Sequence, residues 1–195
     1  MNLVKKYYKK CIEFLKISRA KKIAERYFTM NVFDSIMIML GILIANFFAE
    51  IYDVKITITA CFGAAIAMTI SGIWGAYITE RAERKGEVKK IEDATSLDLK
   101  GSPIEKAHKF ASVILALVNG LSPLITAFII LLPMFFSDYV GVVLAYEVSI
   151  AIALITLFYL GAFLGKISKE NVILYGFEMV FVGLICIAII ILLGL

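Results

Sequence analysis

The chain has 195 residues, of which 61% are hydrophobic and only 18% are charged, and its mean hydropathy is +0.90. A soluble globular domain is nearer half apolar and about a quarter charged. This composition therefore excludes a soluble enzyme, a disordered tail and a disulfide-stapled secreted domain. Five apolar runs exceed the roughly 18 residues that indicate a membrane span, and they argue against nucleic-acid binding despite the formal net charge of +4.

The N-terminal segment, residues 1–29, is predicted to be an amphipathic helix. Its apolar residues recur at helical spacing, and nine Lys and Arg side chains occupy the opposite face. A basic helix of this kind is typical of segments that lie on an anionic leaflet. The alternative is a cytoplasmic helix that packs on a connector of the same chain or on a partner subunit.

The remaining residues, 30–195, are predicted to form an all-α polytopic domain. Backbone polar groups inside a bilayer must be satisfied within the segment, so each apolar run is expected to be a helix. The third run contains Pro123 and Pro133, which are expected to break its hydrogen-bond ladder. The freed carbonyls would coordinate a cation or bond to neighbouring helices. The five predicted spans are 30–49, 56–78, 110–136, 139–164 and 172–195.

The distribution of basic residues predicts the orientation. From the N-terminus onward, the segments outside the spans hold nine, one, eight, none, two and no Lys or Arg residues. Basic segments remain in the cytoplasm. We therefore expect an integral multi-pass protein with a cytoplasmic N-terminus, a cytoplasmic connector at 79–110 and a C-terminus on the other side.

The connector 79–110 is the largest polar segment between spans, and its first half is predicted to extend the second helix. Glu80, Glu83 and Glu87 share part of one helical face. They would recruit a hard divalent cation if they formed a carboxylate cluster. The interleaved Lys and Arg favour the other interpretation, a solvated helix with i,i+4 ion pairs such as Glu80 with Arg84.

Three charged residues lie inside predicted spans, and all three are acids: Asp34, Glu147 and Glu178. A carboxylate at the bilayer centre costs about 2.5–3.5 kcal/mol or more, so such residues mark ion or proton pathways by default. A pathway lined by acids suits cations. The alternatives are a protonated glutamate that hydrogen-bonds between helices and an Asp34 that caps a helix near the inner interface.

Other residues near these acids carry soft or neutral ligand atoms. Asn31 and Met37 share the first span with Asp34, and Met68 lies in the second. Thioether sulfur combined with carboxylate and amide oxygen would suit Fe(II) or Mn(II), although methionine is also a common packing residue. The second span is rich in small residues that allow close helix contact within one chain or across a dimer.

Three stretches resemble the vacuolar iron transporter family in a short, archaeal-type form: ERYFTMNVFDSIMIMLGILIA, FGAAIAMTISGIWGAYITERAE and LYGFEMVFVGLICIAIIILLG. The resemblance implies a homodimeric transporter, not an enzyme, that exports Fe(II) or Mn(II) from the cytoplasm in exchange for protons. It places Asp34 on the ion path. The metal would be cargo, with no permanently bound cofactor, and the partners would be metal ions, the lipid bilayer and a second copy.

The chain departs from the family pattern at two places in the second span. Ser71-Gly72 stands where the family has Ser-Met, and Gly75-Ala76-Tyr77 stands where it has Gly-Glu-Tyr. These departures favour an alternative function, a non-transporting membrane scaffold or regulator that retains the fold. The three acids inside the spans favour transport.

Overall fold

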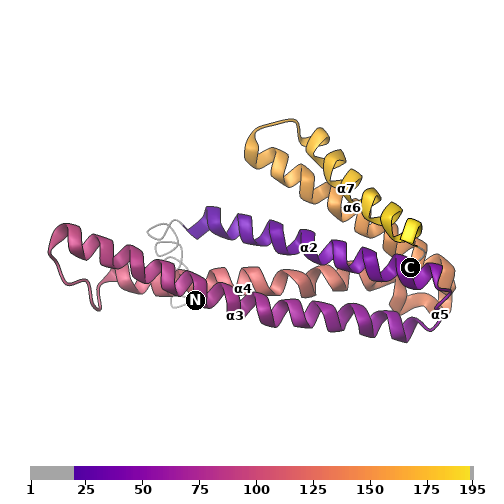
Figure 1. The fold of residues 1–195 in the computed structure, drawn as a ribbon, viewed down its shortest axis with the longest axis horizontal. Helices are drawn as coiled ribbons and strands as arrows, with labels where there is room; N and C mark the ends of the chain where they lie inside the picture. Colours follow the sequence, from indigo (N-terminus) through magenta and orange to yellow (C-terminus); the bar gives the residue numbers. More distant parts are fainter. Residues whose placement is uncertain (1–19, 194–195) are drawn as a thin grey trace, which may run out of the picture. The chain divides into compact units, whose positions relative to one another are not determined.

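The computed structural model describes residues 20–193, and within them the regular secondary structure is all helical, with no strands. Five helical stretches are long and apolar enough to cross a membrane, which confirms the predicted fold class. Residues 1–19, which hold most of the predicted amphipathic helix, lie outside the described part. The elements in chain order are α2 (Ala20–Phe48), α3 (Val54–Thr95), α4 (Pro103–Leu131), the 3-10 helix η1 (Leu132–Phe136), α5 (Ser137–Val140), α6 (Val142–Ser168) and α7 (Val172–Leu193) (Figure 1).

Helix α2 runs without interruption past residue 29, where the predicted amphipathic segment gives way to the first span. Asp34 consequently lies midway along a 29-residue helix. It is too far from the start of this helix to cap it, because the dipole effect falls off within the first turn.

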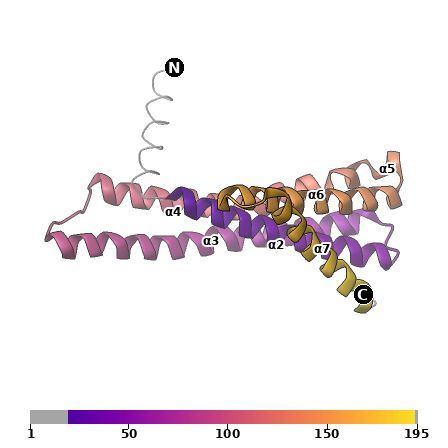
Figure 2. The same cartoon turned by 90° about the horizontal axis from the view of Figure 1, so that it is seen from above.

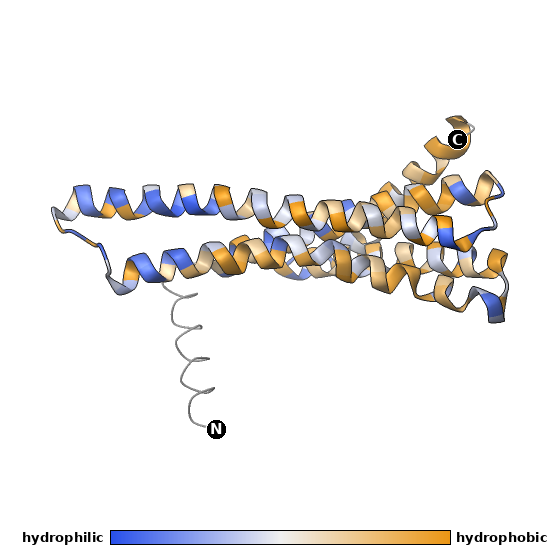
Figure 3. Ribbon diagram, turned by 90° about the horizontal axis from the view of Figure 1, so that it is seen from below, coloured by the Kyte–Doolittle hydropathy of each residue, from blue (hydrophilic) through white to orange (hydrophobic). Residues whose placement is uncertain are grey.

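Helix α3 extends well beyond the predicted second span. Its 42 residues correspond to about 63 Å at 1.5 Å per residue, about twice the thickness of a hydrocarbon core. The excess is polar, as the hydrophilic end of the long helix in Figure 3 shows. Residues 79–110, which we call the charged hairpin, therefore consist of the end of α3, a turn and the start of α4. The sequence predicts the extension of α3, but not the start of α4 inside this segment.

The two prolines of the third span behave differently. Pro133 falls in η1, and α4 ends just before it, at Leu131. Pro123 lies inside α4, which continues through it, so the predicted break at Pro123 is wrong. A proline removes one hydrogen bond, and here the flanking Ser122 and Thr126 are buried. Ser35 of α2 also donates a hydrogen bond to the Pro123 carbonyl, at 3.3 Å.

The described residues divide into two compact units. The first contains residues 20–28 and 70–121, so that it comprises the beginning of α2 and the α3–α4 hairpin seen in Figure 2. Its core consists of Ala20, Ala111 and Leu115, with Tyr27 packed against them. Asn119 of α4 donates a hydrogen bond to the Gly72 carbonyl of α3, at 3.0 Å.

The second unit contains residues 29–69 and 122–193. Its fully buried side chains come from five elements and include Ile36, Leu40, Leu43, Cys61, Ile130, Met134, Tyr146 and Leu157. Helix α7 packs against α6 (Figure 1), and most of its apolar surface remains exposed. Such a surface suits contact with lipid.

Candidate functional site

Asp34 lies on a face of α2 that no other part of the described chain covers. The side chains one turn before and one turn after it, Met30 and Ile38, are 58% and 39% exposed. Asp34 is itself exposed. The opposite face of the same helix carries the buried Ile36 and Leu40. The core of the second unit thus fixes the rotation of α2 and turns Asp34 outward.

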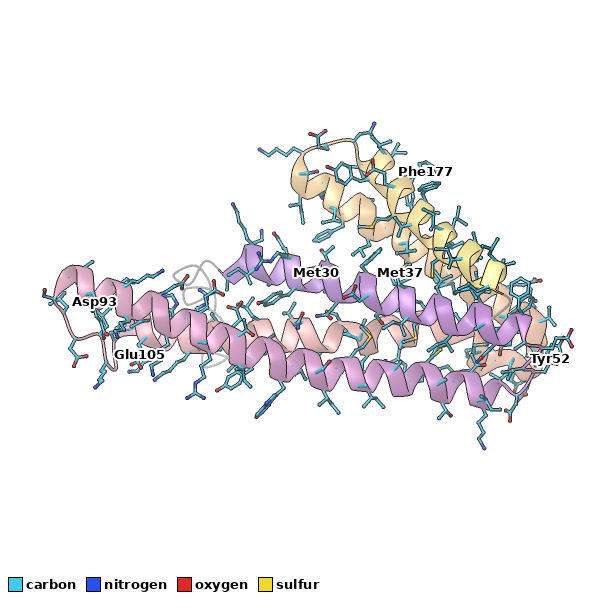
Figure 4. All side chains as sticks on the ribbon, in the orientation of Figure 1. Met30, Met37, Tyr52, Asp93, Glu105 and Phe177 are labelled. Atoms are coloured by element: carbon cyan, nitrogen blue, oxygen red, sulfur yellow. The ribbon has the colours of Figure 1, made fainter. Side chains whose placement is uncertain are left out.

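The neutral candidates around Asp34 are less exposed. Met37 is half-buried and packs against the core of the second unit, and Figure 4 shows it on α2 with Met30. Asn31 is half-buried on the same helix, and Met68 is half-buried on α3. The packing role of Met37 accounts for its position.

The other two acids inside the spans are also exposed. Glu147 lies in the second turn of α6, and Glu178 lies in the second turn of α7. Among residues 20–193, no group of three His, Cys, Asp or Glu side chains is placed to hold a metal ion. One copy of the chain therefore does not gather Asp34, Glu147 and Glu178 around a single ion, and their roles stay predictions.

A chain of hydrogen bonds joins α2, α3 and α6 at the end where α2 turns into α3. The Asn46 amide donates to the Thr57 hydroxyl at 2.8 Å, and this hydroxyl bonds to the Tyr146 hydroxyl at 2.5 Å. Tyr146 in turn donates to the Ile51 carbonyl at 2.8 Å. Satisfied networks of this kind rigidify the helices that they join. The network therefore fixes α6 and its Glu147 relative to α2 and α3.

Glu80 of the charged hairpin is buried, with only 1% of its surface exposed. The Tyr27 hydroxyl donates a hydrogen bond to it at 2.7 Å, and Arg84 Nε approaches it at 3.3 Å. The predicted i,i+4 pair is thus present, but both partners are buried, so the prediction of a solvated pair is wrong at this position. The carboxylate is occupied by Arg84 and Tyr27, which leaves it poorly placed to recruit a metal ion.

The two other acids proposed for metal recruitment lie farther along α3 and are exposed. Glu87 approaches Arg84 Nη1 at 3.4 Å and His108 Nδ1 at 3.3 Å, the latter without the alignment of a hydrogen bond. His108 lies outside the predicted spans. Burial lowers its pKa, nearby Arg84 acts in the same direction, and Glu87 opposes both. The His108 imidazole is therefore mainly neutral at pH 7, and the positive charge of the charged hairpin comes from its Arg and Lys side chains.

The structure explains one of the two departures in the second span. A Cβ atom on Gly72 would lie 3.2 Å from the Gly120 Cα of α4, so α3 and α4 approach each other closely here, and a larger side chain would require the Gly120 backbone to shift. Ala76, one turn later, is 93% buried in the same unit. Gly72 therefore serves the contact between α3 and α4, and Ala76 is a buried position.

Comparisons with known proteins decide the family. A family model described as the VIT family matches residues 97–195, which include α4 to α7. An uncharacterized protein of Methanocaldococcus jannaschii is 34% identical over 160 residues, which cover 80% of each chain. The chain belongs to the VIT family. The match between this family and five membrane-length helices identifies an integral multi-pass protein of a membrane metal-ion transport family. No solved structure matches.

Sequence reasoning did not find every polar residue that holds this VIT-family chain together. Tyr27 lies in the apolar stripe of the N-terminal segment and Tyr146 lies in the predicted span 139–164, yet both hydroxyls bond to groups distant in sequence. A tyrosine in an apolar stripe gives no sign of its partner. The pairing of Glu80 with Arg84 could be predicted because it follows from helical spacing alone.

Proposed function

We propose that the chain transports Fe(II) or Mn(II), exporting the ion from the cytoplasm in exchange for protons. Membership of the VIT family supports metal-ion transport across a membrane. The observation that supports the proposal further is the exposed carboxylate of Asp34, which lies about one turn inside the predicted span 30–49. An acid at this depth that faced only lipid would be costly, so a function that requires it is the better explanation.

We further propose that two copies pair through the uncovered face of α2. A two-fold axis beside α2 would bring the two Asp34 side chains together and remove both from lipid. Two adjacent carboxylates attract a divalent cation strongly, and they also raise each other's affinity for protons. The ion and the protons would then compete for the same pair of groups, which is the requirement of a metal–proton exchanger.

The other two acids fit positions along such a path. With the N-terminus in the cytoplasm, Glu178 would lie about two turns from the cytoplasmic end of α7. Glu147 would lie at a similar depth from the opposite face of the membrane. These depths follow from about 1.5 Å per residue. Glu178 would receive the ion on the cytoplasmic side and Glu147 would release it on the other.

The test is metal transport into proteoliposomes with and without a pH gradient. We expect Fe(II) or Mn(II) transport by the wild type and its loss in Asp34→Asn, which keeps the shape of the side chain and removes its charge. Asp138→Asn is the matched control, because Asp138 is an exposed acid of α5 outside the proposed path. Wild-type rates in Asp34→Asn would remove Asp34 from the path.

A second candidate function is a scaffold or regulator that retains the transporter fold. The observation that favours this function is the close contact between Gly72 and Gly120. Gly72 stands where the family has methionine, and in this chain the position packs two helices together. The same experiment separates the two functions. Absence of any metal movement by the wild type, under all gradients and at full dimer yield, would favour the scaffold.

A further inference from the structure

The first unit contains a cavity of about 690 Å³ in its charged hairpin, between the end of α3 and the start of α4. Figure 4 labels two of its lining residues, Asp93 and Glu105, near the turn that joins the helices. Basic side chains dominate the lining, since six cations face three carboxylates and the mainly neutral His108. The six are Arg81, Arg84, Lys85, Lys89, Lys100 and Lys109.

Internal contacts occupy most of the acids. The Glu92 carboxylate accepts a hydrogen bond from the Leu99 backbone N–H at 2.9 Å. Glu105 accepts one from the Gly101 N–H at 2.7 Å and pairs with Lys109 at 2.6 Å. These contacts hold the turn and the start of α4 in place, and the ion pair with Lys109 compensates the charge of Glu105.

The remaining cations of the lining outnumber the acids that lack an ion-pair partner. Arg84 is paired with Glu80 and Glu87. Within the described part of the chain, no ion pair is formed by the other four, Arg81, Lys85, Lys89 and Lys100. Glu92 and Asp93 are the acids of the lining that face these four cations. A cavity with this excess of cations favours an anion.

An apolar groove continues from the cavity along the same two helices. It is lined by Ile73, Trp74, Ala116 and Leu117, and it shares Tyr77 and Val113 with the basic cavity. The groove residues belong to the predicted spans 56–78 and 110–136, and the cations begin just beyond these spans at Arg81 and Lys109 and continue to Lys100 at the turn. The basic cavity therefore opens where the bilayer surface is expected, and the groove enters the apolar region.

We propose that this combined site binds an anionic phospholipid, with its phosphate among Arg81, Lys85 and Lys89 and one acyl chain along Trp74. Basic pockets beside membrane helices recognise lipid headgroups through this charge complementarity, and arginine binds phosphate oxygens in a bidentate manner. A soluble phosphate anion shares the headgroup chemistry, but it would leave the groove unused. The continuity of cavity and groove favours the lipid.

Trp74 provides a direct probe because it is the single tryptophan of the chain and lines the groove. The protein is reconstituted in phosphatidylcholine containing a small fraction of brominated phosphatidylglycerol, and quenching of Trp74 fluorescence is measured. We expect stronger quenching than with the same fraction of brominated phosphatidylcholine. Equal quenching by the two lipids would overturn the proposal.

Paired variants assign the effect to the cavity. Each juxtamembrane cation contributes a factor on the order of fivefold to anionic-lipid binding, so Lys85→Gln/Lys89→Gln should weaken the preference for phosphatidylglycerol by roughly tenfold or more. The control Lys166→Gln/Lys169→Gln removes the same charge at exposed sites in the second unit and should keep the preference. A preference that survives the first pair would overturn the proposal.

Two further arms test the groove and the source of the phosphate. Moving the tryptophan to the exposed position 181 of α7, with Trp74→Phe and Phe181→Trp, should abolish the excess quenching, because residue 181 lies outside the groove. Excess quenching at the new position would contradict a specific site. Millimolar inorganic phosphate should not reverse the effect at Trp74. If phosphate reversed the excess quenching at Trp74, the cavity would bind a soluble anion, and the proposal of a lipid ligand would be overturned.

Discussion

Glu80 and Arg84 form a buried ion pair in the charged hairpin. The Glu80 side chain is 1% exposed and that of Arg84 is 4% exposed. A buried ion pair is weak support for stability in itself, since desolvation offsets much of its attraction. Removing one partner alone is strongly destabilising, because the charge of the other partner is left buried without compensation.

We therefore expect Arg84→Met to destabilise the protein by roughly 3–5 kcal/mol. The double variant Glu80→Gln/Arg84→Met should lose less than Arg84→Met alone, since it leaves no buried charge. Thermal unfolding in a fixed detergent measures both. Arg81→Met is the control, because Arg81 is exposed and exposed substitutions usually change stability by no more than about 0.5 kcal/mol. Equal effects at positions 81 and 84 would contradict this account.

The sequence predicts the charge of a side chain and its position along a helix better than the direction in which that side chain points. It identifies Asp34, Glu147 and Glu178 as unusual because an acid inside an apolar run is costly wherever it points. The outward direction of Asp34 follows from the rotation of α2, which is set by the burial of Ile36 and Leu40 against other helices. That rotation depends on residues distant in sequence, and no periodicity within α2 reveals it.

Glycine sets the packing of one pair of helices, α6 and α7. A Cβ atom on Gly161 would collide with the Tyr175 carbonyl, and one on Gly165 would lie 2.8 Å from the Val172 Cα. One on Gly176 would lie 2.6 Å from the Phe158 ring. Real Cβ atoms essentially never make contacts this short, and at Gly161 and Gly165 the nearest atoms belong to the backbone of α7. The two helices are thus in contact through their backbones, as small-residue interfaces in membranes allow.

We expect Gly161→Ala and Gly165→Ala each to destabilise the protein by about 1–3 kcal/mol, the usual cost of overpacking. Gly63→Ala and Gly75→Ala are matched controls within a helix, since a Cβ atom at either meets nothing within 4 Å. Alanine favours helices over glycine, so these controls should be neutral or stabilising by up to about 1 kcal/mol. Thermal unfolding in detergent distinguishes the two pairs. Uniform effects at all four positions would argue against backbone contact.

The elements themselves were largely predictable. Long apolar runs admit only helices in lipid, and the run of charges after Ile78 keeps helical spacing, so both the spans and the extension of α3 follow from sequence. Pro133 ends α4 as predicted, whereas Pro123 does not. The difference lies in tertiary surroundings, because Pro123 is buried beside α2 and the packing around it outweighs one lost hydrogen bond.

The orientation of the whole molecule is a prediction of its charge distribution. We expect a reporter that is active only in the cytoplasm to be inactive when fused after Leu195 and active when fused to the N-terminus. A truncation after Ser168 removes α7, so a reporter there should become active. Activity of the full-length C-terminal fusion would reverse the proposed orientation and with it the direction of export.

The proposed dimer makes the strongest prediction for the assembled protein. Met30, Asp34 and Ile38 form the uncovered stripe of α2, whereas Ile36 and Leu43 are fully buried within one copy. If two copies meet through this stripe, a cysteine at position 30, 34 or 38 lies near its counterpart across the two-fold axis. A cysteine at position 36 or 43 remains inside its own copy.

We therefore expect cross-linking in native membranes at positions 30, 34 and 38, and none at 36 or 43, in a chain whose Cys11, Cys61 and Cys186 are replaced by alanine. A cysteine at position 181 of α7 is the control, since Phe181 is 63% exposed on a different helix. Cross-linking at 181 with none along the stripe would place the interface on α7. The two Asp34 carboxylates would then be apart, and the proposed exchange of one divalent ion for protons at a shared pair of acids would fail.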